Sequence, residues 1–189
     1  MNANVGMVYP VAATVSAYTP GTSITYSSGS NFAEAVSANL TWNRADGHFY
    51  ADDAEIDTDN GVLGYTLSFE PSGLKEADRA LLLGETLASS EYTINGDAAP
   101  DIGFGYIRVM RDKGTISYDA WWFHKLKFGV SSEETRTKEQ SVEWRIPTLE
   151  GIGTGVSLDS SGKLAFAVHR SFTAMADAKS WLNGKAGIT

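Results

Sequence analysis

The sequence predicts a mainly β fold: an antiparallel β-sandwich or barrel with one short flanking helix and a second helix at the C-terminal end. Three observations lead to this prediction. Apolar and polar side chains alternate over several runs, which is the period of a half-buried strand. Glycine occurs 19 times and aromatic residues make up 11% of the chain, a composition typical of strands and turns. Each such strand has one apolar face to bury, which favours closure into a sandwich or barrel.

A length of 189 residues predicts a single domain, 1–189, with one hydrophobic core. Residues 1–30 are expected to form an N-terminal arm with a short strand or two, because Pro10 and Pro20-Gly21 interrupt regular structure. Residues 152–189 are expected to be a C-terminal extension made of a strand and a helix.

Two alternating runs follow the N-terminal arm. They are separated by a polar, acidic segment at 44–61, which we expect to be a loop, and Pro71 ends the second run. Period two predicts a strand for each run, with its apolar residues facing the core. These residues are Val36, Ala38, Leu40 and Trp42 in the first run and Leu63, Tyr65, Leu67 and Phe69 in the second.

A short helix is predicted next, with Ser72 as its N-cap and Gly84 as its C-cap glycine. The segment 91–101 is expected to be a loop that turns at Asn95-Gly96. Beyond the central hairpin, the sequence predicts a charged loop at 131–138 and strands at 141–148 and 164–168. The C-terminal helix is expected to start after Thr173 and to stop at Asn183-Gly184, with Met175, Ala178 and Leu182 on one stripe.

The best-defined prediction is a hairpin between residues 102 and 128, with a tight turn at Asp112-Lys113-Gly114. In its second strand, Trp121 and Phe123 lie on the face opposite the main apolar stripe. Two large aromatic residues there indicate a second buried surface. That surface is either a packed sheet of the same chain or a neighbouring subunit.

Composition excludes several kinds of chemistry. The chain has no cysteine, so thiol catalysis, thiolate zinc sites and disulfides are excluded. A formal charge of -8 disfavours tight binding to nucleic-acid phosphates. The three histidines show no metal-ligand spacing, and His124 fits a core or interface histidine better. We find no signal peptide, membrane span, nucleotide-binding loop or catalytic motif, and therefore expect no enzyme activity, metal or cofactor.

An acidic run at residues 52–59 could wrap a hard cation such as calcium. It does not match an EF-hand loop, because Asn60 and Thr66 stand where glycine and glutamate are required. A solvated acidic loop is therefore the favoured interpretation. Two alternatives from other functional classes stay open: a metal-dependent hydrolase that uses this run, and a carbohydrate-binding β-sandwich that uses surface aromatic residues.

An ordered series of short motifs resembles the phage major tail protein family, the tail tube subunits of long-tailed phages. The resemblance covers residues 25–152 and weakens beyond Gly151. The motifs are Ala35-Val36-Ser37-Ala38, Phe49-Tyr50-Ala51-Asp52-Asp53, Asp59-Asn60-Gly61, Leu81-Leu82-Leu83-Gly84, Gly103-Phe-Gly-Tyr-Ile-Arg108, Ala120-Trp121 with Lys125, Lys127 and Phe128, Glu133-Glu134, Thr137-Lys138, Ser141-x-Glu143 and Pro147-Thr-Leu-Glu-Gly151.

The resemblance implies a structural virion protein without enzyme activity or cofactor. Its fold would be similar to the tube proteins of type VI secretion systems, and copies would join edge to edge into hexameric rings that stack into a hollow tube. DNA would pass through the lumen without tight binding. Further partners would be other tail proteins, namely the tape measure, tail terminator and baseplate or distal tail proteins. Assembly in the host cytoplasm and a place in the virion are expected, with no membrane contact.

The resemblance also implies roles for two groups of residues. The loop between the predicted strands would reach the adjacent ring, and its residues of interest are Arg44, Asp46, Asp52, Asp53, Glu55, Asp57 and Asp59. Trp121 and Phe123 would then be the inter-subunit sheet contact. An acidic lumen would repel phosphate, so the genome would slide through it.

Overall fold

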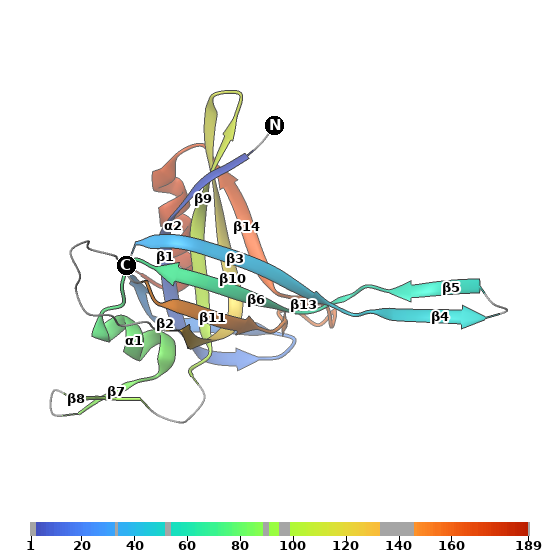
Figure 1. Ribbon diagram of the computed structural model, residues 1–189, viewed down its shortest axis with the longest axis horizontal. Helices are drawn as coiled ribbons and strands as arrows, with labels where there is room; N and C mark the ends of the chain where they lie inside the picture. The colour runs from blue at the N-terminus through green and yellow to red at the C-terminus, as the bar shows by residue number, and fades with distance from the viewer. Residues whose placement is uncertain are drawn as a thin grey trace, which may run out of the picture.

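The computed structural model describes residues 3–32, 34–51, 54–88, 91–94, 99–132 and 146–188. As predicted, the protein is mainly β and antiparallel (Figure 1). Its elements are β1 (Ala3–Thr19), β2 (Ser23–Asn31), β3 (Ala35–Arg44), β4 (Gly47–Ala51), β5 (Ala54–Asp59), β6 (Val62–Pro71), α1 (Glu76–Leu83), β7 (Thr86–Ala88), β8 (Glu91–Thr93), β9 (Ile102–Asp112), β10 (Thr115–Ser132), β11 (Thr148–Gly153), β12 (Val156–Ser157), β13 (Leu164–Ala165), β14 (Ala167–Phe172) and α2 (Met175–Ala186).

An eight-stranded sheet dominates the fold, in the order β2-β1-β9-β10-β11-β6-β3, with β14 paired to β10 off this path. The described strands do not close it into a barrel. The sheet divides at β10, whose register with β9 shifts between Phe123 and Leu126. The first half of β10 pairs with β14 and the second half with β11. Because of this shift, the first half of β10 belongs to one layer of the fold and the second half belongs to another layer.

The two layers cross each other in Figure 1. The back layer contains β2, β1, β9, the first half of β10 and β14. The front layer contains β3, β6, β11 and the second half of β10. Crossed layers of this kind are an orthogonal sheet packing, in which a strand passes from one layer to the other at a bend.

Aromatic side chains fill the space between the layers. Tyr65 and Phe69 of β6 meet Phe123 of β10 and Phe104 of β9, and both ring pairs have centroids 5.1 Å apart. All four side chains are fully buried. Truncating a buried aromatic residue to alanine typically costs about 3–5 kcal/mol, so this cluster contributes strongly to holding the front layer on the back layer.

A second core lies on the other side of the back layer, beneath α2. Ala178, Leu182 and Ala186 of the helix pack on Ile107 and Trp122, together with Val11, Ala13 and Ala120. Gly105 makes this approach possible, because a Cβ there would lie 2.8 Å from Leu182 Cδ2 and 2.7 Å from the Trp121 carbonyl oxygen. The Gly103-Phe104-Gly105 motif therefore has a packing role. Phe104 lies in the core between the two layers, and Gly105 leaves room for α2 on the other side of the back layer.

The structure confirms the predicted hairpin of β9 and β10. Its turn has two residues with positive φ, Lys113 at 47° and Gly114 at 93°, as a type I′ hairpin turn requires. Gly84 closes α1 in the left-handed region, also as predicted. Ser72 is not the N-cap: α1 begins at Glu76, where the Asp78 carboxylate accepts a hydrogen bond from the Lys75 N–H at 3.2 Å.

Three loop or arm predictions differ from the structure. The strands expected in residues 1–30 are present, but they form a long hairpin within the sheet instead of an arm. β1 accommodates Pro10 by a bulge at Tyr9, which has φ of 59°. The acidic segment 44–61, predicted as a loop, is a β-hairpin made of β4 and β5. The segment 91–101 contains β8, which pairs with β7. The predicted turn at 95–96 lies outside the described residues.

Predictions for the C-terminal part are met in outline. The strand predicted at 164–168 appears as β13 and β14. Helix α2 runs to Ala186 with Gly187 as its C-cap, three residues beyond the predicted stop at Gly184. Ala174, instead of Thr173, is the residue before the helix. The predicted strand at 141–148 and loop at 131–138 lie largely outside the described residues.

Candidate functional site

The first candidate surface is an arm made of β4 and β5. It continues the β3–β6 pair and extends well beyond the body of the molecule (Figure 1). At its base, the Ala45 N–H donates to the Gly61 carbonyl at 2.7 Å, and Asp59 Oδ1 accepts from the Gly61 N–H at 2.9 Å. The acidic segment is therefore a two-stranded extension of the front layer.

Most residues assigned to an inter-ring loop belong to this arm. Arg44 is the exposed last residue of β3, and Asp46 lies at the base of the arm, 3.0 Å from His48 Nε2. Glu55 and Asp57 are in β5, opposite Tyr50 and Phe49, and Asp59 is its exposed last residue. Asp52 and Asp53 lie outside the described residues. Segment 46–59 contains acidic residues and no Lys or Arg.

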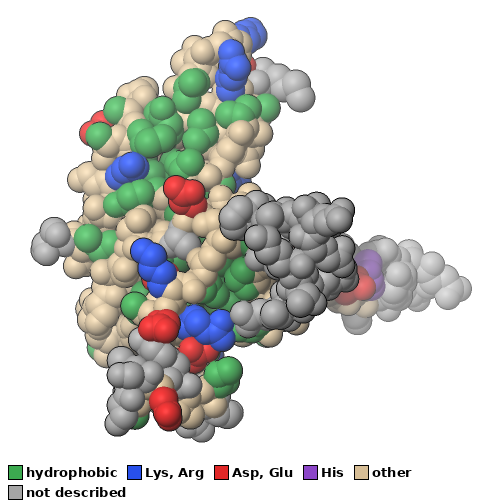
Figure 2. Space-filling view, turned by 60° about the vertical axis from the view of Figure 1, so that its left-hand side comes forward, with side chains coloured by type: hydrophobic (Ala, Val, Ile, Leu, Met, Phe, Trp, Pro, Cys, Tyr) green, Lys and Arg blue, Asp and Glu red, His purple; other side chains and the backbone are tan. Residues whose placement is uncertain are grey.

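The body of the molecule, unlike the acidic arm, carries both basic and acidic side chains (Figure 2). On the face seen in Figure 2, Lys and Arg side chains lie at the top and over the lower part, where Asp and Glu side chains lie beside them, and apolar side chains gather on the upper part. Among the described side chains, this face shows no cluster of basic residues of the kind that holds nucleic-acid phosphates. Nor do the described residues contain a group of three His, Asp or Glu side chains placed to hold a metal ion.

The second candidate surface is the pair of outer edges of the front layer. One edge is β3, which pairs with β6 on one side and with no other described strand. The other is the second half of β10: its pairing with β9 ends at Leu126, and beyond that residue β11 is its sole described partner. Unpaired backbone N–H and C=O groups make such edges ready to pair with another chain.

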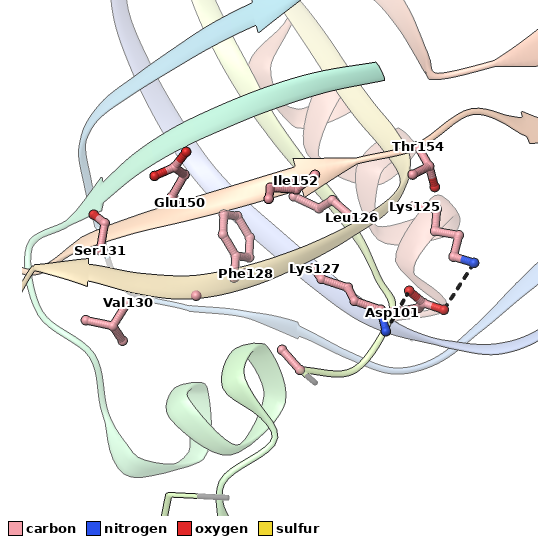
Figure 3. Close-up of a pocket in the computed structure, with 12 residues that line it drawn as sticks. Asp101, Lys125, Leu126, Lys127, Phe128, Val130, Ser131, Glu150, Ile152 and Thr154 are labelled. Atoms are coloured by element: carbon pink, nitrogen blue, oxygen red, sulfur yellow. Dashed lines mark ion pairs between the residues drawn. The ribbon is translucent and has the colours of Figure 1, made fainter. Parts of the chain in front are cut away.

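A hollow of about 710 Å³ follows this edge of β10. It lies between residues 99–101 on one side and β11 on the other (Figure 3). Its exposed apolar lining comes mainly from Ile152 of β11 and Val130 of β10, which are 63% and 40% exposed, whereas Leu126 and Phe128 beneath them are buried. Two lysines at one end share Asp101, with Nζ–Oδ distances of 3.1 Å for Lys125 and 3.7 Å for Lys127. An apolar groove beside a strand edge suits the addition of another strand.

Trp121 and Phe123 are engaged within the chain. Phe123 is fully buried between the layers. Trp121 is half-buried, and its ring stacks on the His169 ring with the two centroids 4.6 Å apart. The Arg108 guanidinium carbon lies 4.3 Å from the centre of the Trp121 ring. Trp121 Nε1 donates a hydrogen bond to Asp119 Oδ2 at 2.6 Å. Of the two interpretations left open by the sequence, the structure shows a strand buried on both faces. Phe123 therefore has no surface to offer a neighbouring subunit.

His124 is a buried histidine of the back layer. The Tyr26 hydroxyl donates to the His124 carbonyl at 2.9 Å and lies 3.4 Å from its Nδ1. Burial, with a smaller effect of the Lys185 charge, lowers the pKa of His124 to about 4. The imidazole is therefore neutral near pH 7, where it is part of the packing around Tyr26.

No protein-family model and no curated protein matches this chain. In the part of the chain that the structure describes, no helix is long and apolar enough to cross a membrane.

Proposed function

We propose that this protein is a structural subunit that assembles with copies of itself into stacked rings, forming the hollow tail tube through which a phage delivers its DNA. The observation that carries this proposal is the β4–β5 arm. An isolated two-stranded hairpin is marginally stable in water. An arm that extends beyond the body (Figure 1) is therefore expected to be held by a partner, and in a stack of rings that partner is the adjacent ring.

The edges of the front layer support ring formation. β3 and the second half of β10 lie on opposite sides of the same layer, so a contact between them joins two different surfaces of the same protein. Such heterologous contacts form closed rings when the rotation between copies closes. The similarity to tail tube proteins suggests hexameric rings, with Arg44, Asp46 and the acidic residues of the arm at the ring-to-ring contact.

The outer face of the front layer suits the wall of a DNA conduit. In β3 and β6 it carries small uncharged polar side chains, namely Ser37, Asn39, Thr41, Thr66 and Ser68, beside the acidic Glu70. Toward β10 the same face carries Glu150, the exposed Ile152 and one lysine, Lys127. Such a face offers no array of cations to the phosphate backbone, and the chain as a whole is acidic. In this proposal DNA slides past the face, and the tube ends bind the other tail proteins.

Negative-stain electron microscopy of purified protein over a range of concentrations tests the proposal. We expect rings at low concentration and hollow tubes at high concentration, without any added ligand. Uniform small particles at every concentration would refute self-assembly. A glycan-binding assay on the same sample separates the main alternative, since a carbohydrate-binding β-sandwich would bind sugars and form no polymer.

A further inference from the structure

We propose that His124 is an acid-sensitive switch, which holds strand β2 and the last turn of α2 on strand β10 while it is neutral and releases them when it becomes charged. The inference goes beyond the proposed function, because it concerns a single subunit and does not depend on assembly. Three features of the chain support it: the way the three elements meet, the charges that face His124, and a hollow that leads to it.

The first feature is a junction that side chains hold together. Among the described strands β2 pairs with β1 alone, so no backbone ladder joins it to β10. Tyr26 of β2 makes the connection instead. Its ring lies edge-on to the Trp122 ring, with the two centroids 5.1 Å apart, and its hydroxyl donates to the His124 carbonyl at 2.9 Å. The position of β2 on β10 therefore depends on the packing around Tyr26 and His124.

The last turn of α2 meets the same junction. A Cβ at Gly29 of β2 would clash with the Ala186 carbonyl and lie 2.9 Å from Ile188 Cγ1, so the strand and the end of the helix are in close contact. Lys185 lines the same hollow as His124. A change of charge at His124 can thus act on both elements.

The second feature is the set of charges that face His124, which is 7% exposed. Tyr26 faces it from β2, and burial raises the pKa of this hydroxyl to about 12, so the hydroxyl is neutral in acid. Lys185 faces it from α2 and carries a positive charge. Leu158 adds an apolar side chain, and the Phe166 carbonyl accepts from the His124 N–H at 3.1 Å.

Acidic residues are missing from the described lining of the hollow, and Asp101, which lies nearby in the chain's contacts, is already ion-paired with Lys125 at 3.1 Å. A charged imidazolium has two N–H donors. Tyr26 Oη, 3.4 Å from Nδ1, can accept one of them, but no described carboxylate of the lining balances the charge. A buried charge without an acidic partner is costly, so protonation favours a state in which water reaches His124.

The third feature is the hollow itself, which has a volume of about 500 Å³ and lies where the three elements meet. Its described lining comes from Ser23, Ile24, Thr25 and Tyr26 of β2, Trp122 and His124 of β10, Leu158, and Gly184, Lys185 and Gly187 at the end of α2. Ser23, Thr25 and Gly184 are exposed to solvent. A proton can therefore reach His124 from this side without unfolding of the subunit.

The size of the effect follows from the two states of His124. In the closed junction, burial and to a smaller extent the Lys185 charge lower the pKa of His124 to about 4. In an open junction the imidazole would have the ordinary pKa of histidine, about 6.5. The open state therefore binds more protons than the closed state as the pH falls below about 6.5, and the closed junction loses stability down to about pH 4. From pH 7 to pH 4.5, the equilibrium constant for opening should rise about fiftyfold.

Hydrogen exchange measured by mass spectrometry at pH 7 and pH 4.5, below the concentration of assembly, tests the proposal. Exchange rates are corrected for the intrinsic effect of pH on amide exchange, so that they report protection. Between the two pH values, peptides from β2 and α2 should lose about fiftyfold more protection in the unmodified protein than in His124→Gln, which cannot titrate at this position. Carboxylates elsewhere titrate in both proteins, so the difference reports His124. His48→Gln, a histidine of the arm, is the matched control and should behave like the unmodified protein.

A second variant, Lys185→Glu, provides a test that does not need the His124 substitution to fold. It places a carboxylate where the Lys185 ammonium faces His124, so the charged imidazolium gains an acidic partner. The acid-induced loss of protection in β2 and α2 should then be about tenfold smaller. Lys179→Glu makes the same change of net charge on the same helix, but at a lysine that lies against Tyr9, 4.8 Å from its ring centre. It should leave the loss unchanged.

Either of two results would overturn the proposal. One is an equal loss of protection at pH 4.5 in the unmodified protein and in His124→Gln. The other is an equal loss in Lys185→Glu and Lys179→Glu. Both are measured on the free subunit, so they are independent of whether the protein forms rings and tubes.

Discussion

Replacing residues 46–60 with Asn-Gly is expected to give a folded subunit that still forms rings but no longer forms long tubes. The replacement is feasible because Ala45 and Gly61 already face each other, with an N–H to carbonyl distance of 2.7 Å. Asn-Gly is the preferred two-residue connection for such a pair. The open edges of β3 and β10 are untouched, whereas the arm that would reach the adjacent ring is gone.

Electron microscopy and sedimentation of the shortened protein measure this effect. As a control, a full-length variant with Glu55→Gln and Asp57→Asn keeps the reach of the arm while it removes two of its charges. If this control forms tubes, the length of the arm is sufficient for contact with the adjacent ring. If it forms no tubes, the two acidic charges are needed as well. Tubes of normal length from the shortened protein would contradict an inter-ring role for the arm.

Gly105→Val is expected to destabilise the subunit much more than the same substitution at Gly6, a strand glycine with open space around it. A Cβ at this position would lie 2.7 Å from the Trp121 carbonyl oxygen and 2.8 Å from both Leu182 and Trp122. Overpacking of this kind typically costs about 3 kcal/mol or less, and sometimes more. For a chain of this length, a loss of 3 kcal/mol corresponds to a decrease in Tm of roughly 6–12 °C.

Thermal unfolding followed by circular dichroism checks this prediction at a concentration below that of assembly. Gly6→Val is the matched control, since no atom lies within 4 Å of a Cβ built at Gly6. The control should unfold near the temperature of the unmodified protein. Equal Tm values for Gly105→Val and Gly6→Val would contradict the close packing of α2 on the back layer.

The fold class could be predicted from the sequence because alternation in the long strands is strong. Errors arise where the backbone leaves the ideal pattern. Val36 was expected to face inward with Ala38, but a bulge at this residue leaves it 53% exposed. In the long strand, alternation with Tyr118, Ala120 and Trp122 also places Ile116 on the apolar stripe, but Ile116 is 49% exposed near the β9–β10 turn. Bulges and strand ends cannot be predicted from alternation alone.

The candidate surfaces were harder to predict. The acidic composition of segment 44–61 suggested a loop, although aromatic and β-branched residues such as Phe49, Tyr50 and Ile56 on both sides of Asp52-Asp53 are a hairpin signal. The sequence correctly indicated two buried faces around Trp121 and Phe123. It could not show that the front layer and α2 of the same chain cover them, because that depends on the register shift in β10.

Hydrogen exchange of β3, measured by mass spectrometry before and after assembly, tests the central claim most directly. Amide exchange reports whether backbone groups are hydrogen-bonded and protected. The claim that copies complete the open sheet predicts rapid exchange at the outward-pointing amides of β3 in the free subunit and strong protection in assembled material. The same protection should appear in residues 127–132 of β10, whereas the buried strand β9 should change little. Equal exchange of β3 in free and assembled protein would contradict the claim.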